Sequence, residues 1–215
     1  MILLNRRELV QSLALASFGV SNPSPAAGST RPFCMYSLKR GWSADGPDVN
    51  EYITRQAGAK DRSGVPQVVS RIETALSFTT PFDILIAEHE DNAFATVANG
   101  RKLLVVDVDF LDNINRVAGT QWAAIQVIAH EVGHHIAGFL ADRHRSELNA
   151  DYWSGQSLQR LGSSLSSATR AILAVGTERD TSSHPNKYRR KEAIAQGWND
   201  ASAGSIDYSY CSGCR

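Results

Sequence analysis

The feature that most constrains this chain is the run His130-Glu131-Val132-Gly133-His134, in which two histidines stand four residues apart and a glutamate follows the first. Side chains at such spacing lie on one face when the backbone is α-helical, so the run predicts a helix. Apolar residues around it recur at helical spacing, and Thr120 is suited to cap a helix that runs to about Leu140. On this helix both imidazoles reach one Zn²⁺ ion, and the adjacent glutamate is placed to act on a zinc-bound water.

A third protein ligand has to come from outside this run. Metzincins supply a third histidine from the same stretch, but the chain has Ala137 and Leu140 where that class has glycine and histidine, which excludes it. Two other histidines are rivals. His135 points about 100° away from His134 around the helix and is expected to be a solvated or packing residue, and His144 is expected to lie exposed in a turn.

The acidic residues Glu147 and Asp151 are the better candidates for the third ligand. If a tight turn follows the zinc helix, the next helix returns antiparallel to it, with a rise of 1.5 Å per residue. Glu147 then comes level with His134, and Asp151 comes level with His130. This geometry favours Glu147 as the ligand and Asp151 as the acceptor that fixes a histidine tautomer. The reverse assignment, with Asp151 as the ligand, stays open.

The rest of the chain predicts an α+β fold. Branched apolar runs predict strands over 82–87, 92–97 and 102–108, and Asn99-Gly100 is a strong hairpin signal between the last two. We therefore expect a small antiparallel sheet followed by a zinc-binding helical bundle, in a single domain over residues 29–215. The helices expected besides the zinc helix cover 47–59, 66–78, 145–161, 164–175 and 185–198.

Charge and hydropathy restrict the partners. Lysine plus arginine number 22, and aspartate plus glutamate also number 22, so the formal net charge is zero. Nucleic-acid binding usually demands a basic surface, so no nucleic acid partner is expected. No apolar run after the N-terminal region is long enough to span a bilayer, so no transmembrane segment is expected once that region is removed.

Residues 1–28 have the order of an export signal followed by a linker. Arg6 and Arg7 precede an apolar stretch over 9–20, and residues 21–28 are rich in small residues and proline. The paired arginines also resemble a twin-arginine signal. The expectation is therefore an exported protein of the bacterial periplasm or the medium. The alternative is an amphipathic first helix docked on the domain of a cytoplasmic protein.

Three cysteines follow that segment: Cys34, Cys211 and Cys214. An oxidising compartment favours a disulfide. The two late cysteines can pair with each other, or either one can pair with Cys34, and the sequence leaves these pairings open. A structural zinc ribbon needs four ligands, which three cysteines do not supply.

Taken together, the zinc helix and the later segment Glu147-Leu148-Asn149-Ala150-Asp151 resemble the gluzincin metallopeptidases of the CaaX-prenyl-protease and HtpX-like group. Asn92-Ala93-Phe94-Ala95 resembles an N-A-F-A segment of that family, and Ser183-His184-Pro185 resembles its late H-P motif. The resemblance covers roughly residues 82–195. The chain departs from the family in two ways. It lacks the membrane helices that many members carry, and its gap between His134 and Glu147 is short.

This resemblance implies a zincin-like fold and roles for the flanking motifs. Asn92, Ala93, Phe94 and Ala95 would form an edge strand that pairs with an extended substrate. His184 would stabilise the tetrahedral oxyanion. The plainer alternatives are an ordinary hairpin strand and a residue that caps a helix begun by proline.

The function expected from these residues is a zinc-dependent metalloendopeptidase. His130, His134 and Glu147 would hold one Zn²⁺ ion, and Glu131 would be the general base for peptide-bond hydrolysis of a protein or peptide substrate. One alternative is a non-catalytic zinc-containing binding or chaperone-like protein of the cell envelope. Another is a zinc hydrolase that acts on a non-peptide amide.

Overall fold

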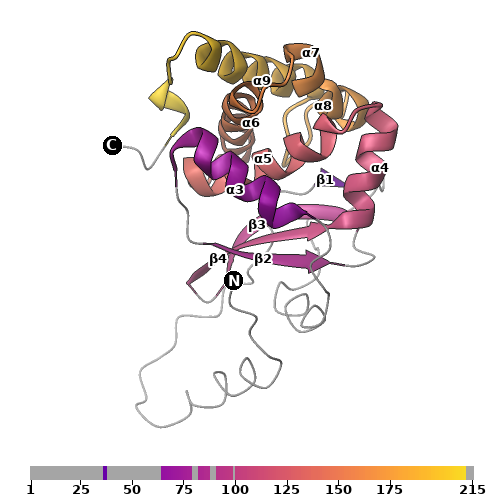
Figure 1. Cartoon of the computed structure of the whole chain (residues 1–215). Helices are drawn as coiled ribbons and strands as arrows, with labels where there is room; N and C mark the ends of the chain where they lie inside the picture. Colours follow the sequence, from indigo (N-terminus) through magenta and orange to yellow (C-terminus); the bar gives the residue numbers. More distant parts are fainter. Residues whose placement is uncertain (1–35, 38–63, 79–81, 88–90, 99, 212–215) are drawn as a thin grey trace, which may run out of the picture.

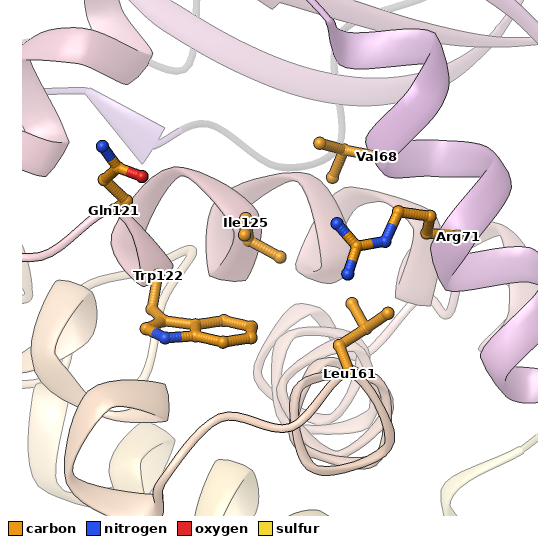
Figure 2. Close-up of a pocket in the computed structure, with 6 residues that line it drawn as sticks. All are labelled: Val68, Arg71, Gln121, Trp122, Ile125 and Leu161. Atoms are coloured by element: carbon orange, nitrogen blue, oxygen red, sulfur yellow. The ribbon is translucent and has the colours of Figure 1, made fainter.

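The computed structural model describes residues 36–37, 64–78, 82–87, 91–98 and 100–211, which form a mixed α and β fold. Apart from one early helix, the strands come first along the chain and the helices follow, as expected for an α+β protein. The helices lie on one side of the sheet (Figure 1). The predicted export signal over 1–28 and the predicted helix over 47–59 lie outside the described residues.

The sheet has four strands in the order β1-β3-β4-β2. Its body consists of β2 (Phe82–Ala87), β3 (Asn92–Ala98) and β4 (Arg101–Asp107), and a two-residue strand, β1 (Tyr36–Ser37), pairs antiparallel with the start of β3. Strand formation over all three predicted segments is confirmed.

The hairpin between β3 and β4 is antiparallel, and Gly100 in its turn has the positive φ of 75° that the Asn-Gly signal requires. The prediction of a wholly antiparallel sheet is nevertheless wrong, because β2 pairs with β4 in parallel. The second strand of the hairpin lies between β2 and β3, which are consecutive in the chain. Periodicity predicts that strands exist but does not fix their order in a sheet.

Two helices flank the sheet and the central helix: α3 (Val65–Leu76) and α4 (Val108–Ala118). The sequence prediction contains α3 but has no helix at α4. This helix follows β4 without a loop, because Asp107 is both the last strand residue and the helix cap. Its carboxylate accepts hydrogen bonds from the N–H groups of Asp109 and Phe110 at 2.9 and 3.4 Å.

The central helix is α5 (Trp122–Ala137), whose residues from 126 to 137 are all buried. It starts two residues after Thr120, whose hydroxyl accepts from the Trp122 N–H at 3.3 Å, and it ends at Ala137, with Gly138 as its C-cap, rather than at Leu140. The predicted helix over 164–175 is divided at Thr169. The remaining helical elements are α6 (Arg143–Arg160), α7 (Leu165–Ala168), α8 (Arg170–Val175), α9 (Lys187–Ser202) and the short 3-10 helix η1 (Tyr208–Tyr210).

Glycines allow α5, α6 and α9 to approach one another closely. A Cβ atom on Gly133 of α5 would lie 2.7 Å from the Ala150 carbonyl oxygen on α6. A Cβ on Gly155 of α6 would lie 2.0 Å from the Ile194 carbonyl oxygen on α9. Because real Cβ atoms do not come so close to backbone oxygens, only glycine fits at these crossings. The short helix separations bring side chains from all three helices together.

Two further expectations from the sequence concern membrane-spanning helices and a disulfide. In the part of the chain that the structure describes, no helix is long and apolar enough to cross a membrane. Cys211 is buried and disulfide-bonded. Cys34 and Cys214 lie outside the described residues.

Candidate metal centre

The three residues of the H-E-x-x-H run lie on α5 with no exposed surface: His130, Glu131 and His134 are each 0% exposed. The two imidazole rings meet edge-to-face, with their centroids 4.8 Å apart and an interplanar angle of 87°, as residues one helical turn apart can do. Burial of ionisable groups is costly unless they find charged or hydrogen-bonding partners. The partners come from α6, α9 and β3.

Glu147 reaches this pair of histidines from α6. Its Oε2 atom lies 3.4 Å from His130 Nε2, and its Oε1 atom lies 3.6 Å from His134 Nε2. One ligand atom from each of the three residues lies within 4.8 Å of the other two. This buried group could therefore bind a metal ion.

Asp151, one helical turn beyond Glu147, contacts the opposite nitrogen of His130. Its Oδ1 atom lies 2.8 Å from His130 Nδ1 and accepts the hydrogen bond from that nitrogen. A histidine that donates from Nδ1 presents Nε2 to a metal. The structure thus places Glu147 with the imidazole Nε2 atoms and Asp151 behind one ring, which is the arrangement that helix geometry favoured in the sequence.

A residue that the sequence reasoning missed completes the site. Arg190 of α9 is 5% exposed and clamps Asp151 with two bonds, Nε to Oδ2 at 2.7 Å and Nη2 to Oδ1 at 2.9 Å. The same Nη2 atom lies 3.5 Å from Glu147 Oε2. Bidentate arginine–carboxylate pairs fix orientation as well as charge. Arg190 therefore ties α9 to the two acidic residues of α6.

A signal for Arg190 is present in the sequence. On α9 the buried residues include Ala193, Ile194 and Gly197, and Arg190 lies on the same helical face, three and four residues before the first two. An arginine within an apolar helical stripe needs a buried carboxylate partner. The unpaired acidic candidates on α6 supply that partner.

The ring of His134 is supported by other groups. Ser146 Oγ, itself buried, lies 3.5 Å from His134 Nδ1. Phe139 stacks on the ring with a centroid distance of 5.7 Å and an interplanar angle of 8°. A neutral hydroxyl and an aromatic face thus hold this histidine, whereas a carboxylate holds His130.

Glu131 makes a direct link to the sheet. Its Oε2 atom accepts a hydrogen bond of 2.7 Å from the backbone N–H of Ala95 on β3. Its Oε1 atom is buried and has no hydrogen-bond partner among the described residues. Burial raises the pKa of this carboxyl to about 8, and the nearby Glu147 carboxylate adds to the effect. In the metal-free protein burial therefore favours the protonated form of this carboxyl.

The other charges follow from burial and from their neighbours. Burial disfavours a charged His130, but Asp151 and the hydrogen bond to Glu147 outweigh it and raise the pKa to about 9 in the metal-free protein. Burial lowers the pKa of His134 to about 3, so this ring is neutral. The pKa of Glu147 is lowered despite its burial, chiefly by the hydrogen bond to His130 and by the charge of Arg190.

His184 lies at the edge of the site, in the segment before α9. Its Nε2 atom is 3.8 Å from Glu147 Oε2, and its side chain is 22% exposed. The Ser183 hydroxyl lies 2.8 Å from the other ring nitrogen and orients the ring. His184 is more exposed than the other residues that contact Glu147.

The N-A-F-A segment forms the first residues of β3. The side chains of Asn92, Ala93, Phe94 and Ala95 are all buried. At Asn92 and Ala93 the strand is paired with β1.

The remaining histidines lie outside the cluster. His135 is 4% exposed, and its Nε2 atom bonds to the carbonyl oxygen of Leu103 on β4 at 2.9 Å, so it is a packing residue that fastens α5 to the sheet. His144 lies in the first turn of α6, and its Nε2 atom bonds to the Thr181 carbonyl at 2.7 Å. Neither belongs to the group that could hold a metal.

The chemistry of the donor set fits a divalent cation. His134 Nε2 and Glu131 Oε1 are buried atoms without hydrogen-bond partners in the described structure, and both belong to the H-E-x-x-H run. Glu147 and Asp151 bring two buried negative charges, against which Arg190 supplies one permanent positive charge. Two imidazoles and one carboxylate form a zinc-type ligand set, and they leave a fourth coordination position open.

Comparison with known proteins adds no further assignment. No protein-family model, curated protein or solved structure shows a significant match to this chain. The gluzincin resemblance therefore stays a prediction from the motifs.

Proposed function

We propose that the protein is a zinc-dependent metalloendopeptidase of the zincin-like, gluzincin type. The observation that carries this proposal is the buried group of His130, His134 and Glu147 with the unpartnered Oε1 atom of Glu131 beside it. A purely structural zinc site is closed by four protein ligands and needs no base, whereas a catalytic site keeps one position open. Three ligands with an adjacent glutamate match the catalytic case.

In the proposed reaction His130, His134 and Glu147 hold the metal, and Asp151 keeps His130 in the tautomer that presents Nε2. The metal, when bound, polarises the scissile carbonyl and lowers the pKa of a water molecule. Glu131 accepts the proton of the attacking water and passes it to the nitrogen of the leaving amine. Its position is fixed by the Ala95 N–H.

His184 is the proposed donor to the developing oxyanion. Its Nε2 atom is buried, has no hydrogen-bond partner in the described structure, and lies on the Glu147 side of the site. Burial lowers the pKa of this ring, so it is neutral near pH 7. With Nδ1 facing the Ser183 hydroxyl, Nε2–H can donate to a carbonyl oxygen.

Cleavage of unfolded casein, with and without a chelator, tests the proposal. We expect cleavage that 1,10-phenanthroline abolishes and that added zinc restores. Glu131→Gln should retain about one zinc per chain and lose at least about 100-fold in kcat, the scale of general-base catalysis. Glu192→Gln on the exposed side of α9 is the matched control and should keep full activity.

The alternatives predict other results. Zinc bound at this group without chelator-sensitive cleavage would favour a non-catalytic binding or chaperone-like protein. Zinc-dependent hydrolysis of small amides but not of casein would favour a non-peptide amidase.

Export is a separate proposal, based on the sequence of residues 1–28. N-terminal sequencing of the protein from fractionated cells tests it. A periplasmic or secreted chain that begins after residue 20 would support export, and a cytoplasmic chain that begins at residue 1 or 2 would contradict it.

A further inference from the structure

The outer side of β3 is shared between the chain's own first strand and the proposed active site. On its inner side β3 pairs with β4 from Ala93 to Ala98. On its outer side Tyr36 and Ser37 of β1 pair with Ala93 and Asn92 in antiparallel register. Farther along β3, the N–H of Ala95 donates a hydrogen bond to the carboxylate of the proposed base, Glu131.

The two contacts are close together along the strand. A strand rises by about 3.3 Å per residue, so the Ala93 position occupied by β1 lies about 7 Å from Ala95. An extended peptide of four or more residues spans about 13 Å. A peptide that lies along β3 beside Glu131 therefore reaches the backbone groups with which β1 pairs.

The pairing between β1 and β3 is also of the kind that an added peptide strand would form. The side chains of Asn92, Ala93 and Ala95 are buried, so recognition on this side depends on the backbone. Strand addition works through backbone hydrogen bonds, largely without regard to sequence. The antiparallel direction of β1 makes it an intramolecular equivalent of such a peptide.

We propose that β1 is an internal competitor for the peptide-binding edge of β3, and that a peptide substrate has to displace Tyr36–Ser37 to bind productively. This inference rests on the proposed function for the identity of the peptide as a substrate. Within the described residues β1 pairs with β3 over two positions, and each backbone hydrogen bond makes a small net contribution. The competition is therefore weak and reversible, and it lowers peptide affinity by about 10-fold.

The test uses the full chain and a peptide-binding assay that needs no catalysis. In a Glu131→Gln background, the double substitution Tyr36→Pro and Ser37→Pro removes the backbone donors of β1. The matched control, Tyr36→Phe and Ser37→Ala, keeps them. Binding of fluorescein-labelled β-casein is followed by fluorescence anisotropy, and thermal unfolding checks that each variant is folded.

We expect the proline variant to bind casein about 10-fold more tightly than the control. A synthetic peptide with the sequence of residues 35–42, added in excess, should reduce casein binding to the proline variant. Equal affinities of the proline and control variants would overturn the proposal, as would the absence of casein binding to both.

The outcome is separable from that of the proposed function. Tighter casein binding without any cleavage by the Glu131 enzyme would support the competition while contradicting the peptidase. Chelator-sensitive cleavage with unchanged casein affinity would contradict the competition alone. With an active enzyme, the proline variant should show a KM about 10-fold lower at unchanged kcat.

Discussion

Substitution of Arg190 by methionine should destabilise the protein strongly, because Asp151 would then be a fully buried carboxylate without its bidentate partner. In the folded protein Asp151 is 0% exposed, and Arg190 holds both of its oxygens at 2.7 and 2.9 Å. Removal of one partner from a buried ion pair costs about 3–5 kcal/mol. For a chain of this size that corresponds to a fall of roughly 6–20 °C in Tm.

A double-mutant cycle isolates the ion pair from other effects of the substitution. Asp151→Asn keeps the shape and an oxygen that can accept from His130 Nδ1 but removes the charge. If the two residues act as a pair, Arg190→Met combined with Asp151→Asn should cost little more than either single change, so that the coupling energy approaches the cost of the smaller single change, about 3 kcal/mol. Urea unfolding of the zinc-free proteins gives the three free energies.

Arg189→Met is the control, since this neighbouring arginine pairs with Asp180 on the exposed side of α9. Its Tm should stay close to that of the parent, because exposed ion pairs contribute little. Two results would show that the buried ion pair does not stabilise the fold. One is that the losses in free energy of unfolding from Arg190→Met and Asp151→Asn simply add. The other is an Arg190→Met variant as stable as Arg189→Met.

Three further outcomes follow from the same structure. Gly133→Ala should push α6 away from α5, because the added Cβ would lie 2.7 Å from the Ala150 carbonyl oxygen, whereas ordinary contacts begin near 3.4 Å. We expect the free energy of unfolding, measured in urea, to fall by about 1–3 kcal/mol. We also expect faster release of zinc to a chelator. Burial lowers the pKa of His135 to about 4 from 6.5, so below pH 6.5 the unfolded chain binds a proton that the folded protein does not. Stability should fall by about 3 kcal/mol between pH 6.5 and pH 4 through this residue, and His135→Gln should show a shallower pH dependence. Zinc at 1,000 times its Kd should raise stability by about 4 kcal/mol over the chelated protein, and His134→Ala should lose this difference.

The zinc helix illustrates how much a local pattern can predict. The spacing of His130 and His134 requires a helix, and a helix of known rise followed by a tight turn ranks Glu147 above Asp151. The structure has that arrangement, with Glu147 at the Nε2 atoms and Asp151 at Nδ1 of His130. Periodicity was sufficient here because both helices pack directly against each other.

The parallel pairing of β2 with β4 could not be predicted in this way. Each strand shows its own apolar pattern, but the order of strands depends on which neighbour buries which face. The sequence did not predict helix α4 for a different reason: Asp107 ends a strand and caps a helix without an intervening loop. The position of Arg190 in an apolar helical stripe indicates a buried arginine, but it does not identify the partner, because Asp151 lies on another helix, 39 residues away in the chain.

The central claim is that His130, His134 and Glu147 hold one catalytic zinc ion. A crystal structure of the protein purified without chelator, with anomalous data collected on both sides of the zinc absorption edge, tests it directly. We predict a single zinc peak within about 2.0–2.2 Å of the Nε2 atom of each histidine and of a Glu147 carboxylate oxygen, with a water in the fourth position. Zinc bound elsewhere, or this group left without zinc in crystals grown with the ion in excess, would show that these residues do not form a zinc site.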